Sequence, residues 1–205
     1  MEEKSQIIIF DYDGTIIKRD LNRVFNNINH KREVIIFVQQ DISKTKDIKK
    51  SIENASRKFN LNLSQEEIEK YSKDYIKEHT EKKIEKEVLE LLKKLSQRYI
   101  LLILTNRSNK SRVKRELEKS NSLNLFKEII SPEDTGFYTK KENFLYILKK
   151  YNIPASKIIS IGNSYSEDIK PSKELGIKTV WITEYLSDLS IKSLSELNEK
   201  DLSKL

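Results

Sequence analysis

The stretch that decides the fold is IIIFDYDGT, at Ile7–Thr15. A short run of β-branched and aromatic residues such as Ile7–Phe10 is typical of a buried strand, and the glycine and threonine further on break it. Asp11 and Asp13 therefore stand where a strand ends and a loop begins. In open α/β sheets this edge is where ligands bind. Of two carboxylates at this spacing, one can attack while the other handles a proton or holds a metal through its neighbouring backbone.

Length and composition narrow the class of protein. A chain of 205 residues suits one core with a modest insertion, and a hydrophobic share of 37% is sufficient for that core. There is no cysteine, which excludes disulfides and thiolate metal sites, and two histidines are too few for a histidine-rich metal centre. No apolar run approaches the ~20 residues of a membrane span. Since no signal peptide precedes the first strand, we expect a cytoplasmic protein without a membrane partner.

The charge balance is basic, with a net charge of +7 and a pI of about 9.2. Such a balance could indicate nucleic acid or another polyanion as partner. The lysines, however, are spread along the chain and interleaved with glutamates, as in EKKIEKE at Glu81–Glu87. This mixture is typical of a solvated helix face. This pattern favours a lysine-rich, solvated surface over a dedicated binding site for a polyanion. A nucleotide or a nucleic-acid end stays the alternative ligand that the basic charge suggests. The sequence leaves the oligomeric state open.

The segment 17–82 is poor in glycine and proline and has helical periodicity. One helix is predicted over 46–59, and a second near Ser64, where Ser64 and Glu67 match a capping box. The predicted apolar faces consist of Ile48, Ile52, Ala55 and Phe59 in the first helix, and of Ile68, Tyr71, Tyr75 and Ile76 in the second. We interpret 17–82 as a small helical cap inserted into a core made of 1–16 and 83–205.

From about residue 84 onward, strands alternate with helices, which predicts an α/β fold with a parallel sheet. The tail from Ser187 to Leu205 is polar with scattered leucines and is expected to be a docked or frayed helix. The predicted strands are Tyr99–Leu104, Phe126–Ile130, Ile158–Ile161 and Lys178–Ile182, and the predicted helices lie at 84–95, 109–120, 141–151 and 167–175.

Three further groups of polar residues accompany these elements. Thr105-Asn106-Arg107 follows a strand, and its hydroxyl, amide and guanidinium groups suit a phosphate. Lys140-Lys141 begins a helix, and a lysine there would neutralise a phosphoryl group and the attacking carboxylate together. GNSYSED, at Gly162–Asp168, again follows a strand and opens a helix. All of them fall near the same expected edge of the sheet.

These motifs, in this order, resemble the four motifs of the haloacid dehalogenase-like (HAD) phosphohydrolase superfamily. The segment Asp11–Thr15 is similar to the first motif, Asp-x-Asp-Gly-Thr, and Thr105 fits the second. The register of the helix that contains Leu148 favours Lys140 as the lysine of the third motif, with Lys141 as the alternative. The resemblance covers nearly the whole chain and implies a Rossmann-like three-layer core with a parallel sheet, plus a small α-helical cap domain.

The resemblance implies a phosphatase that hydrolyses a phosphate monoester of a small metabolite. Asp11 would attack phosphorus and form an aspartyl-phosphate, and Asp13 would protonate the leaving oxygen and later activate water. Thr105 and Lys140 would hold the phosphoryl oxygens, so both count as catalytic and substrate-binding. The aspartate pair favours a phosphatase over the superfamily's dehalogenases, which lack the second aspartate. Further substrate contacts are expected from Asn106 and Arg19, with Lys18 as another candidate for an anionic tail.

The cofactor that the resemblance implies is Mg²⁺, held by Asp11, the backbone carbonyl of Asp13, Asp168 and Asn163. Gly162–Asp168 is similar to the fourth motif, Gly-Asp-x-x-x-x-Asp, but Asn163 replaces its first aspartate. An amide offers Mg²⁺ a carbonyl oxygen without a charge, so weaker metal binding is expected. Glu167 is a candidate to compensate. The alternative interpretation is a catalytically weakened binding protein on the same fold.

Overall fold

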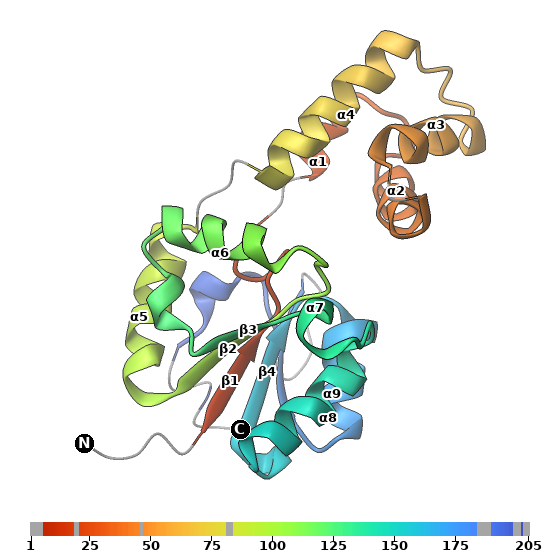
Figure 1. The fold of residues 1–205 in the computed structure, drawn as a ribbon. Coiled ribbons are helices and arrows are strands. Elements are labelled where there is room, and N and C mark those ends of the chain that lie inside the picture. The colour runs from red at the N-terminus through yellow and green to blue at the C-terminus, as the bar shows by residue number, and fades with distance from the viewer. Residues whose placement is uncertain are drawn as a thin grey trace. The chain divides into compact units, whose positions relative to one another are not determined.

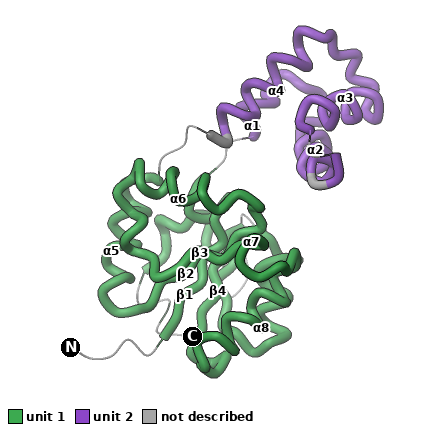
Figure 2. Tube along the Cα trace, viewed as in Figure 1, with its two compact units in different colours: residues 1–18, 83–205 green, residues 19–82 purple. Residues whose placement is uncertain are grey.

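The computed structural model describes residues 6–18, 21–45, 47–80, 84–183, 190–198 and 202. Two compact units divide the chain, one within 1–18 and 83–205 and the other within 19–82 (Figure 2). The boundary of the first unit thus falls after Lys18, and Ile17 is buried in its core. In the described part of the chain, no helix has the length and apolar character required to cross a bilayer.

The first unit contains a sheet in which all neighbouring strands are parallel. In the described residues its strands are β1 (Ile7–Phe10), β2 (Ile100–Leu104), β3 (Glu128–Ile130), β4 (Ile158–Gly162), β5 (Lys178–Ile182) and β6 (Ser190–Ile191). Their order is β3-β2-β1-β4-β5-β6. The strand order reverses between β1 and β4, and in open α/β sheets the carboxyl ends of the strands at such a point form the ligand crevice.

Helices and short turns complete both units (Figure 1). The first unit contains α5 (Lys86–Arg98), α6 (Lys110–Lys119), α7 (Pro132–Thr135), α8 (Lys140–Tyr151) and α9 (Lys170–Glu174), with the turns η1 (Leu123–Leu125), η2 (Ala155–Lys157), η3 (Tyr165–Ile169) and η4 (Leu194–Glu196). The second unit contains α1 (Leu21–Val24), α2 (Lys31–Thr45), α3 (Ile48–Lys58) and α4 (Gln65–Thr80).

The sheet is covered by helices on both faces, as Figure 1 shows for α5 and α6 on one side and α8 and α9 on the other. Successive strand residues point to opposite faces, so Ile8 and Phe10 pack toward α5 and α6, while Ile7 and Ile9 pack toward α8. A parallel sheet buried on both faces requires uninterrupted apolar strands, which explains the run Ile7–Phe10. The predicted Rossmann-like three-layer core with its parallel sheet is confirmed.

The tail expected as a docked or frayed helix differs in part. Ser190 pairs with Trp181 of β5 and is a strand residue, while Leu194, Leu197 and Leu202 enter the core; residues 187–189, 199–201 and 203–205 lie outside the described residues. A two-residue strand owes its conformation to the neighbouring strand, so its own sequence does not reveal it. The helix expected at 167–175 is present, but it begins with a π-helical turn, η3, which precedes the short α9.

The second unit has its own apolar core, built around Phe25, Tyr71 and Tyr75. The capping box at the start of α4 is confirmed, because the Ser64 amide donates to Glu67 (2.8 Å) and the Glu67 amide donates to the Ser64 hydroxyl (3.2 Å). Ile76 was expected on the buried stripe but is 49% exposed. It follows Tyr75 by one position, a rotation of about 100° that carries its side chain off the stripe.

Candidate active site

The loop after β1 folds tightly against the loop after β4. Asp11 continues the pairing of the two strands by donating its amide hydrogen to the carbonyl of Ile161 (2.9 Å). The chain then turns back, and the amides of Ile16 and Ile17 both donate to the Tyr12 carbonyl. Gly14 has φ +85°, and a Cβ at this position would overlap the side chain of Asn163. A glycine is therefore required both by the turn and by the close approach of Asn163.

Lys140 lies between two carboxylates. It comes from the first turn of α8, its side chain is 4% exposed, and its ammonium group donates to Asp11 Oδ1 (2.5 Å) and to Asp168. Lys141 has a different environment, since it is exposed and pairs with Glu174 (2.7 Å). Of the two lysines named by the sequence, Lys140 is therefore the one that reaches the first aspartate.

Asp168 is buried on the π-helical turn η3. Such turns are rare and are frequently found at functional sites. Its Oδ2 accepts a hydrogen bond from the Ser164 amide (2.8 Å), while Oδ1 accepts from Lys140. A Cβ at Gly162 would overlap this carboxyl group, so the glycine that ends β4 provides the space for Asp168.

Burial and charge set the ionisation of this cluster. Burial raises the pKa of Asp11 to about 6, with Lys140 opposing the increase and Asp168 adding to it. For Lys140, burial lowers the pKa, but the two carboxylates outweigh it and hold the pKa above its ordinary value. Lys140 is thus charged at neutral pH, and Asp11 is mostly ionised there. A carboxylate that is buried yet ionised is suited to act as a nucleophile.

Asp13 has a separate partner, Arg107. Its carboxylate accepts two hydrogen bonds from the guanidinium group, from Nε (2.7 Å) and from Nη2 (2.5 Å). The same guanidinium donates from Nη1 to Glu116 (2.8 Å). We expected Arg107 to face a phosphate, but its guanidinium group pairs with Asp13 and Glu116. Glu116 was not identified from the sequence. Its signal was its position beside Val113 and Leu117, on the apolar face of a helix where a carboxylate needs a partner.

The remaining described candidate residues, Thr105, Asn106 and Lys18, lie on the loops that follow β2 and β1. Thr105 is buried just after β2, where its amide extends the pairing to Ile130 and its hydroxyl accepts from the Arg107 amide (3.2 Å). Asn106 is exposed and donates to Glu167 (3.5 Å), which links the loops after β2 and β4. Lys18 is exposed and lines a small pocket of about 90 Å³. Arg19 lies outside the described residues.

Asn163 faces the same oxygens as the expected cation. With its amide nitrogen toward them, the side chain donates to Asp11 Oδ2 and to the carbonyl of Asp13, both at 3.2 Å. Asp11 Oδ2 also accepts from the Thr15 hydroxyl (3.1 Å). In this orientation Asn163 is a donor, and its carbonyl oxygen becomes a metal ligand only after the amide turns around.

The chemistry of these groups fits a hard divalent cation. Asp11, Asp168, the Asp13 carbonyl and the Asn163 amide all offer oxygen, the ligand atom that Mg²⁺ prefers. The buried ion pairs join four carboxylates, Asp11, Asp13, Glu116 and Asp168, to two well-buried cations, Lys140 and Arg107. Within the described residues, no three His, Cys, Asp or Glu side chains gather into a metal cluster. Asn163 stands where the fourth motif has its first aspartate, so this position does not add a carboxylate to Asp11 and Asp168.

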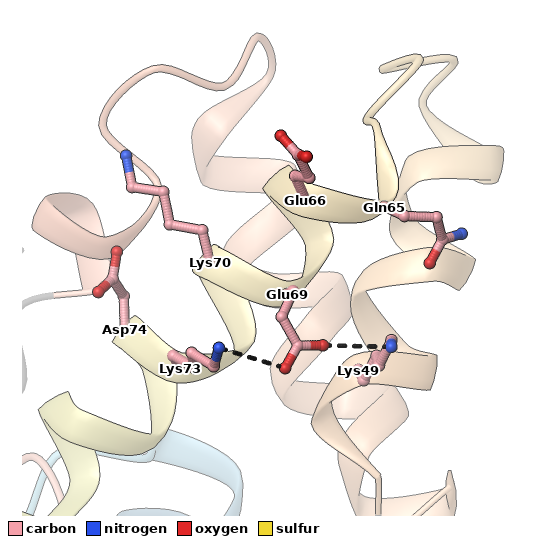
Figure 3. Close-up of a pocket in the computed structure, with 7 residues that line it drawn as sticks. All are labelled: Lys49, Gln65, Glu66, Glu69, Lys70, Lys73 and Asp74. Carbon is pink, nitrogen blue, oxygen red and sulfur yellow. Dashed lines mark ion pairs between the residues drawn. The ribbon is translucent and has the colours of Figure 1, made fainter.

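The second unit contains a larger pocket, of about 600 Å³, along α3 and α4 (Figure 3). Glu69 lies at its centre and pairs with Lys49 (3.2 Å) and Lys73 (3.6 Å). These side chains are about half exposed or more, and none of the lining residues belongs to a motif. Exposed ion pairs of opposite charge are typical of a solvated helix surface, so we do not assign chemistry to this pocket.

Known proteins are similar to this chain over part of its sequence and in their fold. A stretch of 83 residues is 37% identical to a glyceraldehyde 3-phosphate phosphatase of Methanocaldococcus jannaschii, covering 35% of this chain and only 36% of that protein. A HAD-hydrolase of Bacillus subtilis bound to magnesium superposes with a TM-score of 0.68 at 21% identity, over 95% of this chain and 97% of the other. A predicted phosphoglycolate phosphatase of Haemophilus somnus gives a TM-score of 0.64 at 18% identity, over 96% and 97%.

The similarity to hydrolases in sequence and in fold agrees with the position of the four motifs after the strands of this chain. The family model described as haloacid dehalogenase-like hydrolase matches residues 8–182, which include all four motifs and the helical insert. The expected superfamily membership is thereby confirmed, and the chain belongs to the haloacid dehalogenase-like hydrolase family.

Proposed function

We propose that the chain is a Mg²⁺-dependent phosphatase that cleaves a phosphate monoester of a small metabolite through an aspartyl-phosphate on Asp11. The observation that carries this proposal is the contact of Asp11 with Lys140 and, through it, with Asp168. Family membership and the phosphatase named among the relatives support it. The second aspartate, Asp13, favours phosphoryl transfer because it supplies the proton that an ester leaving group needs.

In the first step, an ionised oxygen of Asp11 attacks phosphorus, and the bond between phosphorus and the ester oxygen breaks. Asp13 has to carry a proton for this step, so one of its two hydrogen bonds from Arg107 opens first. Asp13 then donates that proton to the ester oxygen, which leaves as an alcohol. Lys140 has to shift from the attacking carboxylate toward the phosphoryl oxygens as negative charge moves onto them. Thr105 would donate its hydroxyl hydrogen to the same group; in the described contacts that hydroxyl is an acceptor, from the Arg107 amide.

In the second step, water attacks the phosphorus of the aspartyl-phosphate while Asp13 removes its proton. The phosphorus–oxygen bond to Asp11 breaks, phosphate leaves, and the carboxylate is restored. Both steps use Asp13 in opposite protonation states, as microscopic reversibility demands. The chain needs no histidine, serine or cysteine for this chemistry.

Mg²⁺ would be held by Asp11, Asp168, the Asp13 carbonyl and Asn163 with its amide turned, and would neutralise charge on the phosphoryl group. Two carboxylates, Asp11 and Asp168, share the single ammonium of Lys140, and this excess of negative charge supports a dication here. The helical second unit, inserted just after the first motif, is proposed to act as the cap that excludes bulk water and selects the substrate.

The test is turnover of para-nitrophenyl phosphate and a panel of phosphorylated metabolites with Mg²⁺, with and without EDTA. Asp11→Asn should abolish turnover. Asp13→Asn should slow hydrolysis of the intermediate, so that mass spectrometry of acid-quenched protein finds phosphate on the peptide that contains Asp11. Phosphate on another peptide, or turnover that survives Asp11→Asn, would contradict the mechanism.

The same panel separates the alternatives. If phosphorylated oligonucleotides outcompete small esters, with an affinity that falls steeply with salt, the substrate is a nucleic-acid end. If no ester is turned over with any divalent metal and Asn163→Asp restores nothing, the chain is a binding protein on this fold.

A further inference from the structure

Arg107 lies at the centre of a network that holds Asp13. Its guanidinium group forms a fork-to-fork pair with the Asp13 carboxylate through two hydrogen bonds of 2.7 and 2.5 Å. The Arg107 side chain is 15% exposed and that of Asp13 is 22% exposed, so water competes little with this pair. A bidentate pair fixes both the position and the plane of a carboxylate, which a single hydrogen bond does not.

The guanidinium is itself anchored on its other side by Glu116. Oε2 of Glu116 accepts from Arg107 Nη1 (2.8 Å) and from the Tyr12 hydroxyl (2.9 Å), and Oε1 accepts from Arg112 (3.1 Å). The Arg107 guanidinium carbon also lies over the Tyr12 ring, 4.9 Å from its centroid. Since Glu116 is 8% exposed and Tyr12 fully buried, the anchor belongs to the packed core.

The network joins the loop after β1 to the loop after β2 and to α6, which directly follows that second loop. Three of the five N–H groups of Arg107, one each on Nε, Nη1 and Nη2, donate to protein carboxylates. The edge formed by Nε and Nη2 is occupied by Asp13. Binding a substrate anion through that edge would require Arg107 to give up Asp13, and would leave a carboxylate unpaired in a largely buried setting.

We propose that Arg107 is a positioning residue that orients Asp13 for proton transfer, with Glu116 and Tyr12 as the anchor of its guanidinium group. This inference rests on the proposed phosphatase function, in which Asp13 carries the proton. The Asp13 side chain is partly exposed, and the fork fixes the plane of its carboxylate as well as its position. A fixed carboxylate has the orientation that efficient general acid–base catalysis needs.

The experiment compares Arg107→Met, Arg107→Lys and Glu116→Gln with a matched control, Arg115→Met. Arg115 lies on the exposed side of α6, the helix that contains Glu116. Each variant is assayed with para-nitrophenyl phosphate, whose leaving group needs no proton, and with an alkyl phosphate, whose leaving group does. For the alkyl ester we expect Arg107→Met to lower kcat by about 10–100-fold, a part of the usual contribution of general acid–base catalysis, with KM nearly unchanged. Formation of the aspartyl-phosphate from para-nitrophenyl phosphate, measured in a single turnover, should slow much less.

The variants Arg107→Lys and Glu116→Gln distinguish the fork-to-fork pair from a simple positive charge at position 107. Lysine cannot form the fork, so Arg107→Lys should resemble Arg107→Met, whereas Glu116→Gln should give a smaller loss of kcat and Arg115→Met none. A rise in KM without a loss of kcat, or rescue by lysine, would identify Arg107 as a substrate-binding cation and overturn the proposal. Equal losses in the rate at which the two substrates form the aspartyl-phosphate in a single turnover would also overturn it.

A structural readout separates this inference from the phosphatase proposal. If the wild-type protein hydrolyses no ester, the proposed function fails, and crystal structures of Arg107→Met and Glu116→Gln then decide on the positioning role. A changed or multiple Asp13 rotamer in the variants supports it. An Asp13 side chain that keeps its single orientation without Arg107 refutes it.

Discussion

Replacing Lys140 by methionine should destabilise the first unit strongly, because the side chain is 4% exposed and its ammonium faces both Asp11 and Asp168. Methionine has a similar volume but leaves two carboxylates close together without a cation. Breaking a buried ion pair in this way costs about 3–5 kcal/mol. Protonation of one carboxyl group limits the penalty. With an ordinary pKa of 3.8, such protonation costs about 5 kcal/mol at pH 7.5 and about 2 kcal/mol at pH 5.5, at 1.36 kcal/mol per pH unit.

The expected loss is therefore largest near neutral pH and smaller in mild acid. The sign follows from proton binding: the pKa of Asp11 is already raised to about 6, and loss of Lys140 raises it further. Between the ordinary and the raised pKa, the folded state holds more protons than the unfolded state, so stability falls as pH rises. Asp11→Asn should not cause this loss of stability near neutral pH, because it leaves one carboxylate, Asp168, paired with the Lys140 ammonium.

The assay is urea unfolding in EDTA at both pH values, followed by fluorescence of the single tryptophan, Trp181, which lies in β5 and reports on the first unit. Lys141→Met is the matched control, because Lys141 is exposed and its loss should leave stability close to wild type. If Lys140→Met is as stable as this control at pH 7.5, or is destabilised more at pH 5.5, the ammonium does not compensate buried carboxylates and the reasoning fails.

Three further predictions follow from individual contacts. Asn163→Asp should bind Mg²⁺ at least about tenfold more tightly, or ~1.4 kcal/mol, yet melt lower than wild type in EDTA; an unchanged Mg²⁺ dependence of the melting temperature would contradict this. Gly136→Ala, at φ +71° in open space, should cost about 1–2 kcal/mol, and Gly14→Ala should cost more because its methyl group also displaces Asn163; urea unfolding followed by Trp181 tests whether the order holds. Ser64→Ala removes the acceptor of the Glu67 amide, so hydrogen exchange should accelerate in the first turn of α4 and not at the start of α3, whose cap is Asp47.

The parts of the fold that could be predicted are those that local pattern determines. The apolar run Ile7–Phe10, followed by an acidic turn, identifies a strand and its carboxyl end without reference to other residues. Because parallel strands end at one edge, the same reasoning placed the motifs of Asp11 and Asp168 at neighbouring loops. The capping box at Ser64 is likewise a local signal.

The parts that could not be predicted depend on partners distant in sequence. Arg107 was assigned to a phosphate because its guanidinium suits one, and only the packing of α6 shows that Glu116 and Asp13 take its donors. The strand β6 exists through its pairing with β5. The register of the helix favoured Lys140 and kept Lys141 as the alternative, and the structure distinguishes the two by burial and by their different carboxylate partners.

The central position of β1 has a consequence for how the chain folds. Its first residue, Ile7, pairs with Ile100 on one side and with Ile158 on the other, so both hydrogen-bonding edges of β1 wait for segments made much later. Closing loops of that length delays pairing, and an unpaired apolar strand is prone to association in the meantime. We expect nascent chains that stop before β4 to need a chaperone, because β1 is the first of the described strands to be synthesised and waits longest for its second neighbour.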